Sequence, residues 1–393
     1  MSEKGNGSQS LYFDYNATTP LDERVLQGMA PFFSPKFHNP SSSYRAAAAT
    51  FHAVEEARRR VAALIGARAG EIVFTSGGTE ADNLALFGTV RLRAGHGGHI
   101  VTSAIEHSAV LRAVQQLQTE GFSATFLSVD GGGRIDPDDL RRAIRPDTIL
   151  ISLMSANNEI GTIQPVPELA RVARERRVPF HSDAVQAVGK VPLDVRDLGI
   201  DLLALSGHKI YGPKGSGALW VRGGVRLQPL LFGGGQERGL RSGTENVPAI
   251  VGLGLAAELA SAEMNGEGPR LSGLRERLRR GILERIPGTA ANGPEGRDAL
   301  PNTLNISFRD ADGGALLAYL DQRGFALSAG SACSAKSTKP SHVLTAIGLD
   351  EERARSSLRI SLGRFSDEAG VDSLLEALVD SVAAVRGQPP SWR

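Results

Sequence analysis

One lysine in a glycine-rich loop is the strongest candidate in this sequence for covalent chemistry. Lys209 follows the apolar run DLLALS (201–206) within SGHKIYGPKGSG, among glycines and small polar residues. Most lysines are solvated, but a lysine that is desolvated in a cleft can lose its charge and become a nucleophilic amine, the basis of Schiff-base chemistry. Lys209 is therefore a candidate nucleophile.

The only cysteine of the chain, Cys333, is the second candidate. It lies in the stretch LSAGSACSAKSTKPS (327–341). A free cysteine usually packs in a core as a small hydrophobic residue, and reactivity needs a particular environment. From Ser328 to Ser341, however, no apolar side chain is larger than alanine except Pro340 and the cysteine itself. Because little here could bury the thiol, we expect a mobile segment that carries a reactive cysteine.

Other polar groups directly follow apolar runs. EIVFT (71–75) leads into SGGT (76–79) and then a helical pattern, and a helix N-terminus of small residues can hold a phosphate. A plain strand-to-helix turn explains that stretch equally well. His107 follows HIVTS (99–103), and Asp183 ends VPFHSD (178–183). Taken singly, a structural histidine and a helix-capping aspartate are the simpler interpretations of these two.

The elements that must bring these groups together alternate along the chain up to about residue 221. Continuous apolar strands separated by amphipathic helices predict a mostly parallel sheet with both faces covered. In such a sheet, ligands bind beyond the carboxyl ends of the strands. The seven expected strands are 71–75, 99–103, 124–129, 148–154, 178–182, 201–206 and 217–221.

The pattern changes after the glycine-rich segment 231–244, where helical patterns (246–262 and 271–286) precede two further strands, 303–308 and 357–362. We expect an α/β protein with two domains. Residues 17–265 would form the large cofactor-binding domain, and residues 12–16 with 266–393 a smaller α+β domain that carries the cysteine segment. The boundary is placed near residue 265 in the polar stretch AEMNGEGPR, and residues 1–11 are expected to be a disordered lead-in.

Composition argues against several classes of protein. The chain has 393 residues, 44 basic against 43 acidic side chains and a net charge of +1, so no broad field favours nucleic acid or an anionic membrane. One cysteine allows no intrachain disulfide or multi-cysteine metal site and fits a reducing compartment. No signal peptide and no apolar run of about 18 residues is apparent. We expect a cytoplasmic protein without metal, membrane or direct nucleic-acid binding.

Pyridoxal 5'-phosphate is a cofactor that would use all of these groups. Its phosphate needs an anion site, its aldehyde takes a lysine, and an aspartate keeps its ring nitrogen protonated so that the ring withdraws electrons. Two other motifs are discounted. GLGLAA (252–257) resembles a dinucleotide fingerprint but follows no strand, and GPKGSG (212–217) lacks the Gly-Lys-Ser/Thr ending of a Walker loop.

Ten segments then resemble a known family, in order and without a large gap. They read YFDYNATTP, HNPSS, FTSGGTEADN, EHSAV, NNEIG, HSDAVQAVGK, SGHKIYGPKG, GGGQERGLRSGT, GSACS and SSLRISLGRF. From about Tyr12 to about Ser381 the chain resembles the cysteine desulfurases of the nitrogen-fixation and iron–sulfur-assembly type, in the class V aminotransferase superfamily. The resemblance implies the fold of pyridoxal-phosphate aminotransferases, a homodimer, and conversion of L-cysteine to L-alanine.

The resemblance also implies roles for residues around the cofactor. Lys209 would form the Schiff base and move the Cα proton, Asp183 would pair with the ring nitrogen, and Gln186 would donate to the ring hydroxyl. His107 would stack on the ring and assist proton transfers, and Asn158 would lie beside it. The implied phosphate ligands are Gly78, Thr79, Ser206, His208 and, from the neighbouring subunit, Thr244.

For the substrate, the resemblance implies that Arg359 clamps the carboxylate in a bidentate pair, with Asn16 close by. Cys333 would take the sulfur as a persulfide and pass it to an acceptor or iron–sulfur scaffold protein. Lys336 and Lys339 make the cysteine loop basic, where family members often carry an acidic or neutral loop. The acceptor pathway stays open among iron–sulfur clusters, nitrogenase, thiolated RNA, DNA phosphorothioation and thio-cofactors.

Two alternatives have different requirements. Another pyridoxal-phosphate enzyme, such as an aminotransferase or selenocysteine lyase, would share Lys209 and Asp183 without depending on Cys333. A catalytically silent sulfur carrier or scaffold would keep the fold but have no chemical need for these three residues together with His107 and Arg359.

Overall fold

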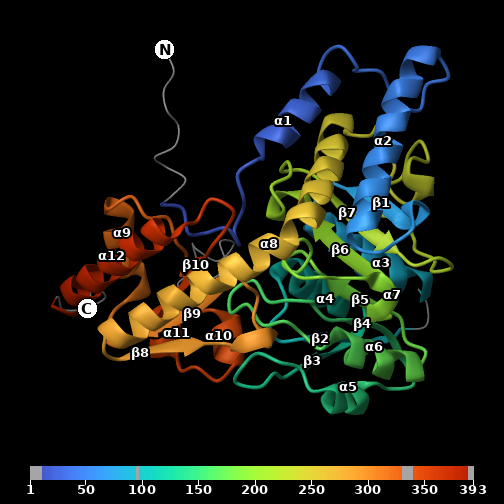
Figure 1. Cartoon of the computed structure of the whole chain (residues 1–393). Coiled ribbons are helices and arrows are strands. Elements are labelled where there is room, and N and C mark those ends of the chain that lie inside the picture. Colours follow the sequence, from blue (N-terminus) through green and yellow to red (C-terminus); the bar gives the residue numbers. More distant parts are fainter. Residues whose placement is uncertain (1–10, 94–96, 330–339, 388–393) are drawn as a thin grey trace.

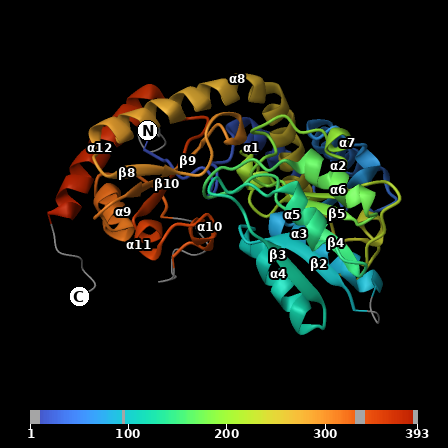
Figure 2. The same ribbon diagram turned by 90° about the horizontal axis from the view of Figure 1, so that it is seen from below.

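The computed structural model describes residues 11–93, 97–329 and 340–387. Cys333, Lys336, Lys339 and residues 1–10 of the expected lead-in lie outside these ranges. Two bodies are visible in Figure 1, a larger one around a seven-stranded sheet and a smaller one around a three-stranded sheet. One long helix, α8 (Val247–Arg285), extends from the first body to the second in both views (Figures 1 and 2).

The large sheet contains all seven strands expected from the sequence. Its spatial order is β1-β7-β6-β5-β4-β2-β3. The pairs β6–β5, β5–β4, β4–β2 and β2–β3 are parallel, whereas β7 runs antiparallel to both of its neighbours, so the prediction of a mostly parallel sheet is confirmed. The strands are β1 (Ile72–Thr75), β2 (His99–Ser103), β3 (Ser123–Leu127), β4 (Thr148–Ser152), β5 (Phe180–Asp183), β6 (Leu202–Ser206) and β7 (Gly217–Val221).

Helices cover both faces of this sheet. Besides α8 they are α1 (Glu23–Met29), α2 (Arg45–Leu64), α3 (Gly78–Val90), α4 (Ser108–Thr119), α5 (Pro137–Ala143), α6 (Val166–Glu175) and α7 (Val195–Leu198). One face packs against α3 and α4, and the other against α2, α6 and the first half of α8. The strands are accordingly apolar on both sides: Val73 and Phe74 of β1 are neighbours in sequence and belong to cores on opposite faces.

The smaller body contains an antiparallel sheet in the order β10-β9-β8, formed by β8 (Thr289–Asn292), β9 (Thr303–Phe308) and β10 (Ser357–Ser361). Its core includes residues of α8, α9 and α12. The sequence analysis missed β8, because the segment TAAN has a single β-branched residue and is only partly buried. The remaining helices are α9 (Gly313–Gln322), α10 (His342–Ala346), α11 (Glu351–Arg355) and α12 (Glu368–Arg386).

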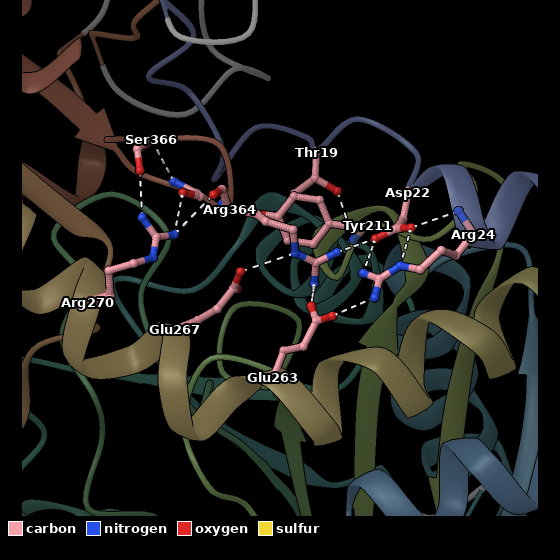
Figure 3. Close-up of polar contacts among 10 residues, drawn as sticks. Thr19, Asp22, Arg24, Tyr211, Glu263, Glu267, Arg270, Arg364 and Ser366 are labelled. Carbon is pink, nitrogen blue, oxygen red and sulfur yellow. Dashed lines mark hydrogen bonds and ion pairs between the residues drawn. The ribbon is translucent and has the colours of Figure 1, made fainter. Parts of the chain in front are cut away.

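The expectation of two helices separated by a polar stretch near residue 265 is wrong. The single helix α8, 39 residues long, passes through that stretch and through Pro269. Its polar residues have partners on other elements: Glu263 and Glu267 bind Arg364, and Arg270 donates to the carbonyl of Ser366 at 2.6 Å (Figure 3). By length and composition α8 could cross a membrane, but half of its most apolar window is buried inside the molecule.

Candidate active site

A cavity of about 200 Å³ lies where the carboxyl ends of β5 and β6 meet Arg359 of β10. Of the expected site residues that the structure describes, all but Thr244 line it, and Cys333 lies outside the described residues. Thr244 is exposed on the surface of this chain. The lining residues that had been expected are Asn16, Gly78, Thr79, His107, Asn158, Asp183, Gln186, Ser206, His208, Lys209 and Arg359.

The anion-binding end of the site is built by the turn between β1 and α3. A second hollow opens here beside the N-terminus of α3. The turn is crowded by neighbouring atoms: a Cβ added to Gly217 of β7 would lie 2.6 Å from the main-chain Cα of Gly77, and one added to Gly78 would lie 2.7 Å from the side-chain Cγ2 of Val185. Only glycine allows the strands and the turn to approach this closely, which leaves the N–H groups of α3 directed at the hollow.

Lys214, which was not predicted from the sequence, lines the same hollow as Thr79 and His208. The signal was the segment GPKGSG, which was set aside because it fails as a Walker loop. In the fold this segment connects β6 to β7 and returns the chain past the N-terminus of α3, so it adds a cation to the anion-binding end.

Lys209 ends the 3-10 turn η4 (Gly207–Lys209) directly after β6. Its Nζ donates to the main-chain carbonyls of Asn16 at 2.5 Å and Ala17 at 2.7 Å. The amine is therefore held at the wall of the cavity by the segment that precedes α1. The imidazole of the adjacent His208 contacts Thr18 Oγ1 at 3.0 Å, and burial, followed by the nearby Lys209 and Lys214, lowers the pKa of His208 to about 4.

Asp183 ends β5 and presents a buried carboxylate to the cavity. One of its oxygens accepts a hydrogen bond from the N–H of Val185 at 2.9 Å. Burial raises the pKa of Asp183, while His107 and Lys209 act in the opposite direction by their charge. His107 is the N-cap of α4, where its Nδ1 accepts from the N–H of Ala109 at 3.2 Å. A cation placed against Asp183 would keep it ionised.

Gln186 and Asn16 have partners that the sequence did not indicate. Gln186 donates through Nε2 to the carbonyl of Asn16 at 3.0 Å, and its Oε1 accepts from Nζ of Lys190 at 2.5 Å. The side chain of Asn16 donates to the carbonyl of Asn158 and to Thr303, and accepts from Asn302. Asn16 thus joins the segment before α1 to both bodies, in addition to lining the cavity.

Arg359 is almost completely buried, with 1 % of its surface exposed. Its Nη2 forms an ion pair with Asp14 at 2.6 Å, and Nη1 donates to the carbonyl of Asn158 at 3.1 Å. Within the described part of the chain, Nε has no hydrogen-bond partner. Two fixed contacts therefore orient the guanidinium, and donors remain for a ligand in the cavity.

The described residues on either side of Cys333 are attached to this site. Ser328 pairs with Arg359 through two main-chain hydrogen bonds of 2.6 and 3.3 Å. On the other side, Ser341 donates to the carboxylate of Glu159 at 2.5 Å, and a ring nitrogen of His342 lies 3.0 Å from the carbonyl of Glu106. Glu159 and Glu106 are each adjacent in sequence to a residue that lines the cavity.

Comparison with known proteins gives a consistent picture. A family described as Aminotransferase class-V matches residues 11–374. A protein of Methanosarcina thermophila named "Cysteine desulfurase IscS" is 50% identical over 384 residues, covering 98% of this chain and 94% of that protein. A Dictyoglomus turgidum protein of the same name is 46% identical over 388 residues, covering 98% of each chain.

Two solved structures are similar over nearly the whole chain. One described as "NIFS-LIKE PROTEIN" has a TM-score of 0.90 and 37% identity, and covers 96% of this chain and 100% of its own. Another, "SspA in complex with cysteine", has a TM-score of 0.81 and 42% identity, and covers 91% of this chain and 99% of its own.

Proposed function

The chain belongs to the class-V aminotransferase family, and we propose that it is a cysteine desulfurase that uses pyridoxal 5'-phosphate to convert L-cysteine to L-alanine. The observation that carries this proposal is the meeting of Lys209, Asp183 and Arg359 in one cavity. An amine, a buried carboxylate and a buried guanidinium are the groups that this cofactor and an amino-acid carboxylate require.

Pyridoxal phosphate fits the residues present. The glycine-lined turn before α3, with Thr79, Ser206 and His208, would hold the phosphate, and Asp183 would hold the ring nitrogen. Gln186, His107 and Asn158 would lie around the ring. When bound, the cofactor supplies an electron sink that loosens bonds at the Cα of an amino acid.

The chain's own residues would bind the substrate and move its protons. Arg359 would pair with the carboxylate of cysteine, and its contacts to Asp14 and Asn158 would keep the guanidinium in one orientation. The amine of Lys209 would take the Cα proton and return it. The Asn16 and Ala17 carbonyls that now accept from this amine would keep it at the wall of the cavity.

We propose Cys333 as the residue that takes the sulfur. Its thiolate would attack the sulfur of cysteine, so that an S–S bond forms as the Cβ–S bond breaks. The electron pair left on the carbon skeleton would be protonated at Cβ to give alanine, and the sulfur would stay on Cys333 as a persulfide for an acceptor protein. The attachment of Ser328 to Arg359 and of Ser341 to Glu159 supports this role, because both described ends of the segment border the substrate end of the cavity. The acceptor would serve iron–sulfur cluster assembly or the synthesis of another sulfur-containing compound.

We also propose a cytoplasmic homodimer in which Thr244 of one subunit reaches the phosphate site of the other. Large aromatic side chains on the surface of this chain support a partner subunit: Phe232 is 82%, Phe37 71% and Phe33 65% exposed. Light scattering of the purified holoenzyme would show a dimer, and a monomer that still holds its cofactor would contradict the proposal.

The experiment that tests the function compares the wild type with Cys333→Ala. Each is given L-cysteine and a reductant, and alanine and sulfide are quantified. Alanine from the wild type, lost in the variant while the bound cofactor absorbance persists, is the expected result. Equal alanine from both would contradict the role of Cys333, and selenocysteine turnover by the variant would favour a lyase.

A further inference from the structure

A buried aspartate that the proposed mechanism does not use lies in the wall of the cavity. Asp82 is on α3, one turn after Thr79, and 1 % of its surface is exposed. Its Oδ1 lies 3.5 Å from Nε2 of His181, which is completely buried. Among the described residues, neither of these two atoms has a hydrogen-bond partner. The 3.5 Å approach thus brings together two buried polar atoms that have no described hydrogen-bond partner.

Asp82 shares this region with two other buried carboxyl groups. His181 and Asp183 are two residues apart on β5, so both side chains point to the face of the sheet that α3 covers. Glu106, in the turn after β2, is also buried, and its Oε1 accepts from Ser103 Oγ at 2.6 Å and from the N–H of Met154 at 3.0 Å. Burying three ionised carboxylates together without compensating positive charges would strongly destabilise the fold, so at least one of them must be protonated.

The surroundings of the three carboxyl groups differ in whether they favour the ionised or the neutral form. Asp183 accepts an N–H hydrogen bond and faces His107 and Lys209, so it is the group that can ionise. Among the described residues, no comparable donor or cation acts on Asp82, and burial, followed by repulsion from Asp183 and Glu106, raises the pKa of Asp82 well above its ordinary value. Burial likewise raises the pKa of Glu106, to about 8.

His181 is suited to accept a hydrogen bond from a protonated Asp82 carboxyl group. Burial lowers the pKa of His181 to about 3, so its ring is neutral and carries one N–H. Nδ1 lies 2.9 Å from Ser152 Oγ. With the ring proton on Nδ1 and directed at Ser152, Nε2 becomes an acceptor that faces Oδ1 of Asp82.

We propose that Asp82 is a positioning residue for the carboxylate of Asp183: Asp82 is a neutral acid that donates to His181, and it leaves Asp183 as the single anion at this end of the cavity. This inference rests on the proposed binding of pyridoxal phosphate. No proton is gained or lost during turnover, because the proton stays between Asp82 and His181. A second anion here would compete with Asp183 for the ring nitrogen and change the proton affinity of the cofactor.

The first test uses the apoprotein and does not depend on the cofactor. Between its ordinary and its raised pKa, each buried neutral acid makes the unfolding equilibrium constant rise about tenfold per pH unit, because the folded state binds one more proton than the unfolded state. Asp82→Asn removes one such acid and keeps the shape. Its unfolding equilibrium constant, measured with urea from pH 5 to 7, should therefore rise less steeply with pH than that of the wild type. The difference should be a factor of about ten for each pH unit.

Glu106→Gln is the matched control, because it removes the other buried acid without touching His181. It should flatten the pH dependence by a similar factor. If the unfolding constant of Asp82→Asn depends on pH as steeply as that of the wild type, the proposal is overturned, whatever the control shows. Asp82 would then be ionised in the folded wild-type protein. If Asp82→Asn does not fold, the ¹⁵N shifts of His181 in the unchanged protein decide: a neutral ring protonated on Nδ1 supports the proposal, and an imidazolium overturns it.

The second test uses the holoenzyme and the absorbance of its bound cofactor. Asp82→Asn should leave the pH titration of that absorbance in place, because an amide is as neutral as the acid and can donate to Nε2. A displacement by about one pH unit or more would mean that an anion had been removed, and would overturn the proposal.

Asp82→Ala leaves Nε2 without a donor and should weaken cofactor binding roughly tenfold, whereas Asp82→Asn restores it. Equal affinity in the two variants would contradict a donating role. If the protein binds no pyridoxal phosphate at all, the proposed function fails, and the apoprotein measurement still decides the protonation of Asp82.

Discussion

At the scale of single residues, Arg359 shows how a buried charge can be kept for a ligand. Asp14 neutralises it, and the carbonyl of Asn158 fixes a second edge of the guanidinium. Lysine keeps the positive charge but cannot reproduce two fixed contacts and still offer parallel donors to a carboxylate. A specific loss of substrate binding is therefore expected from the conservative change.

Arg359→Lys should raise the KM for cysteine about 10- to 100-fold, the equivalent of about 1.5–3 kcal/mol for hydrogen bonds to a charged group. Cofactor affinity should change little, because the guanidinium is assigned to the substrate. Arg355→Lys is the control: its ion pair with Glu351 is on the surface of α11 and close in sequence. Equal KM values for the two variants would remove Arg359 from the substrate site.

The residues of this site differ in how well the sequence could predict them. Lys209, Asp183 and Arg359 carry chemistry that a single position can suggest once a resemblance is found. Asp14, Asn302 and Asp82 could not be predicted in the same way, because each acts through a partner that only the fold brings near. Asp14 and Arg359, for instance, are 345 residues apart in sequence.

At the scale of elements, the approach of β7 to the β1–α3 turn shapes the anion-binding end. The sequence predicted both strands because their apolar runs are continuous and short. It could not predict that Gly217 touches Gly77, since this contact depends on β7 pairing antiparallel to β1. The single helix α8 was missed for a similar reason: the partners of its polar stretch lie on α1 and beyond β10.

Gly217→Ala should weaken cofactor binding about 5- to 150-fold, because overpacking at a backbone contact commonly costs about 1–3 kcal/mol. A Cβ at this position would meet the main chain of Gly77 at 2.6 Å and displace the turn that presents the N–H groups of α3. Gly70→Ala, where an added Cβ meets no atom within 4 Å, is the control. Titration of each apoprotein with pyridoxal phosphate measures the effect. Unchanged affinity in Gly217→Ala would show that the turn between β1 and α3 can shift without weakening cofactor binding.

At the scale of the whole molecule, the site is divided between the two bodies. Lys209 lies in the turn after β6 of the large sheet, and Arg359 lies in β10 of the small one. The loop after β10 returns to the large body through Arg364, whose guanidinium pairs with Asp22, Glu263 and Glu267 (Figure 3). Arg364 also lies over the ring of Tyr211, 4.2 Å from its centroid, and donates its N–H to the Tyr211 hydroxyl at 2.6 Å.

These contacts tie together the two chain segments that carry the chemistry, because Tyr211 is two residues from Lys209 and Arg364 is five residues from Arg359. Arg364→Met should lower the free energy of unfolding by about 2–3 kcal/mol, since it leaves partly buried carboxylates without their cation. It should also raise the KM for cysteine, as Lys209 and Arg359 lose their fixed separation.

The matched variant is Arg277→Met, which removes another ion pair of α8, to Asp372 of α12, on the surface. An exposed pair of this kind contributes about 0–1 kcal/mol, so this variant should unfold and bind cysteine almost as the wild type does. Urea unfolding and steady-state kinetics of both variants show whether the specific contacts of Arg364 or only the loss of a surface charge causes the effects. Equal effects of the two changes would mean that the position of Arg359 relative to Lys209 is set by the packing of α8 alone.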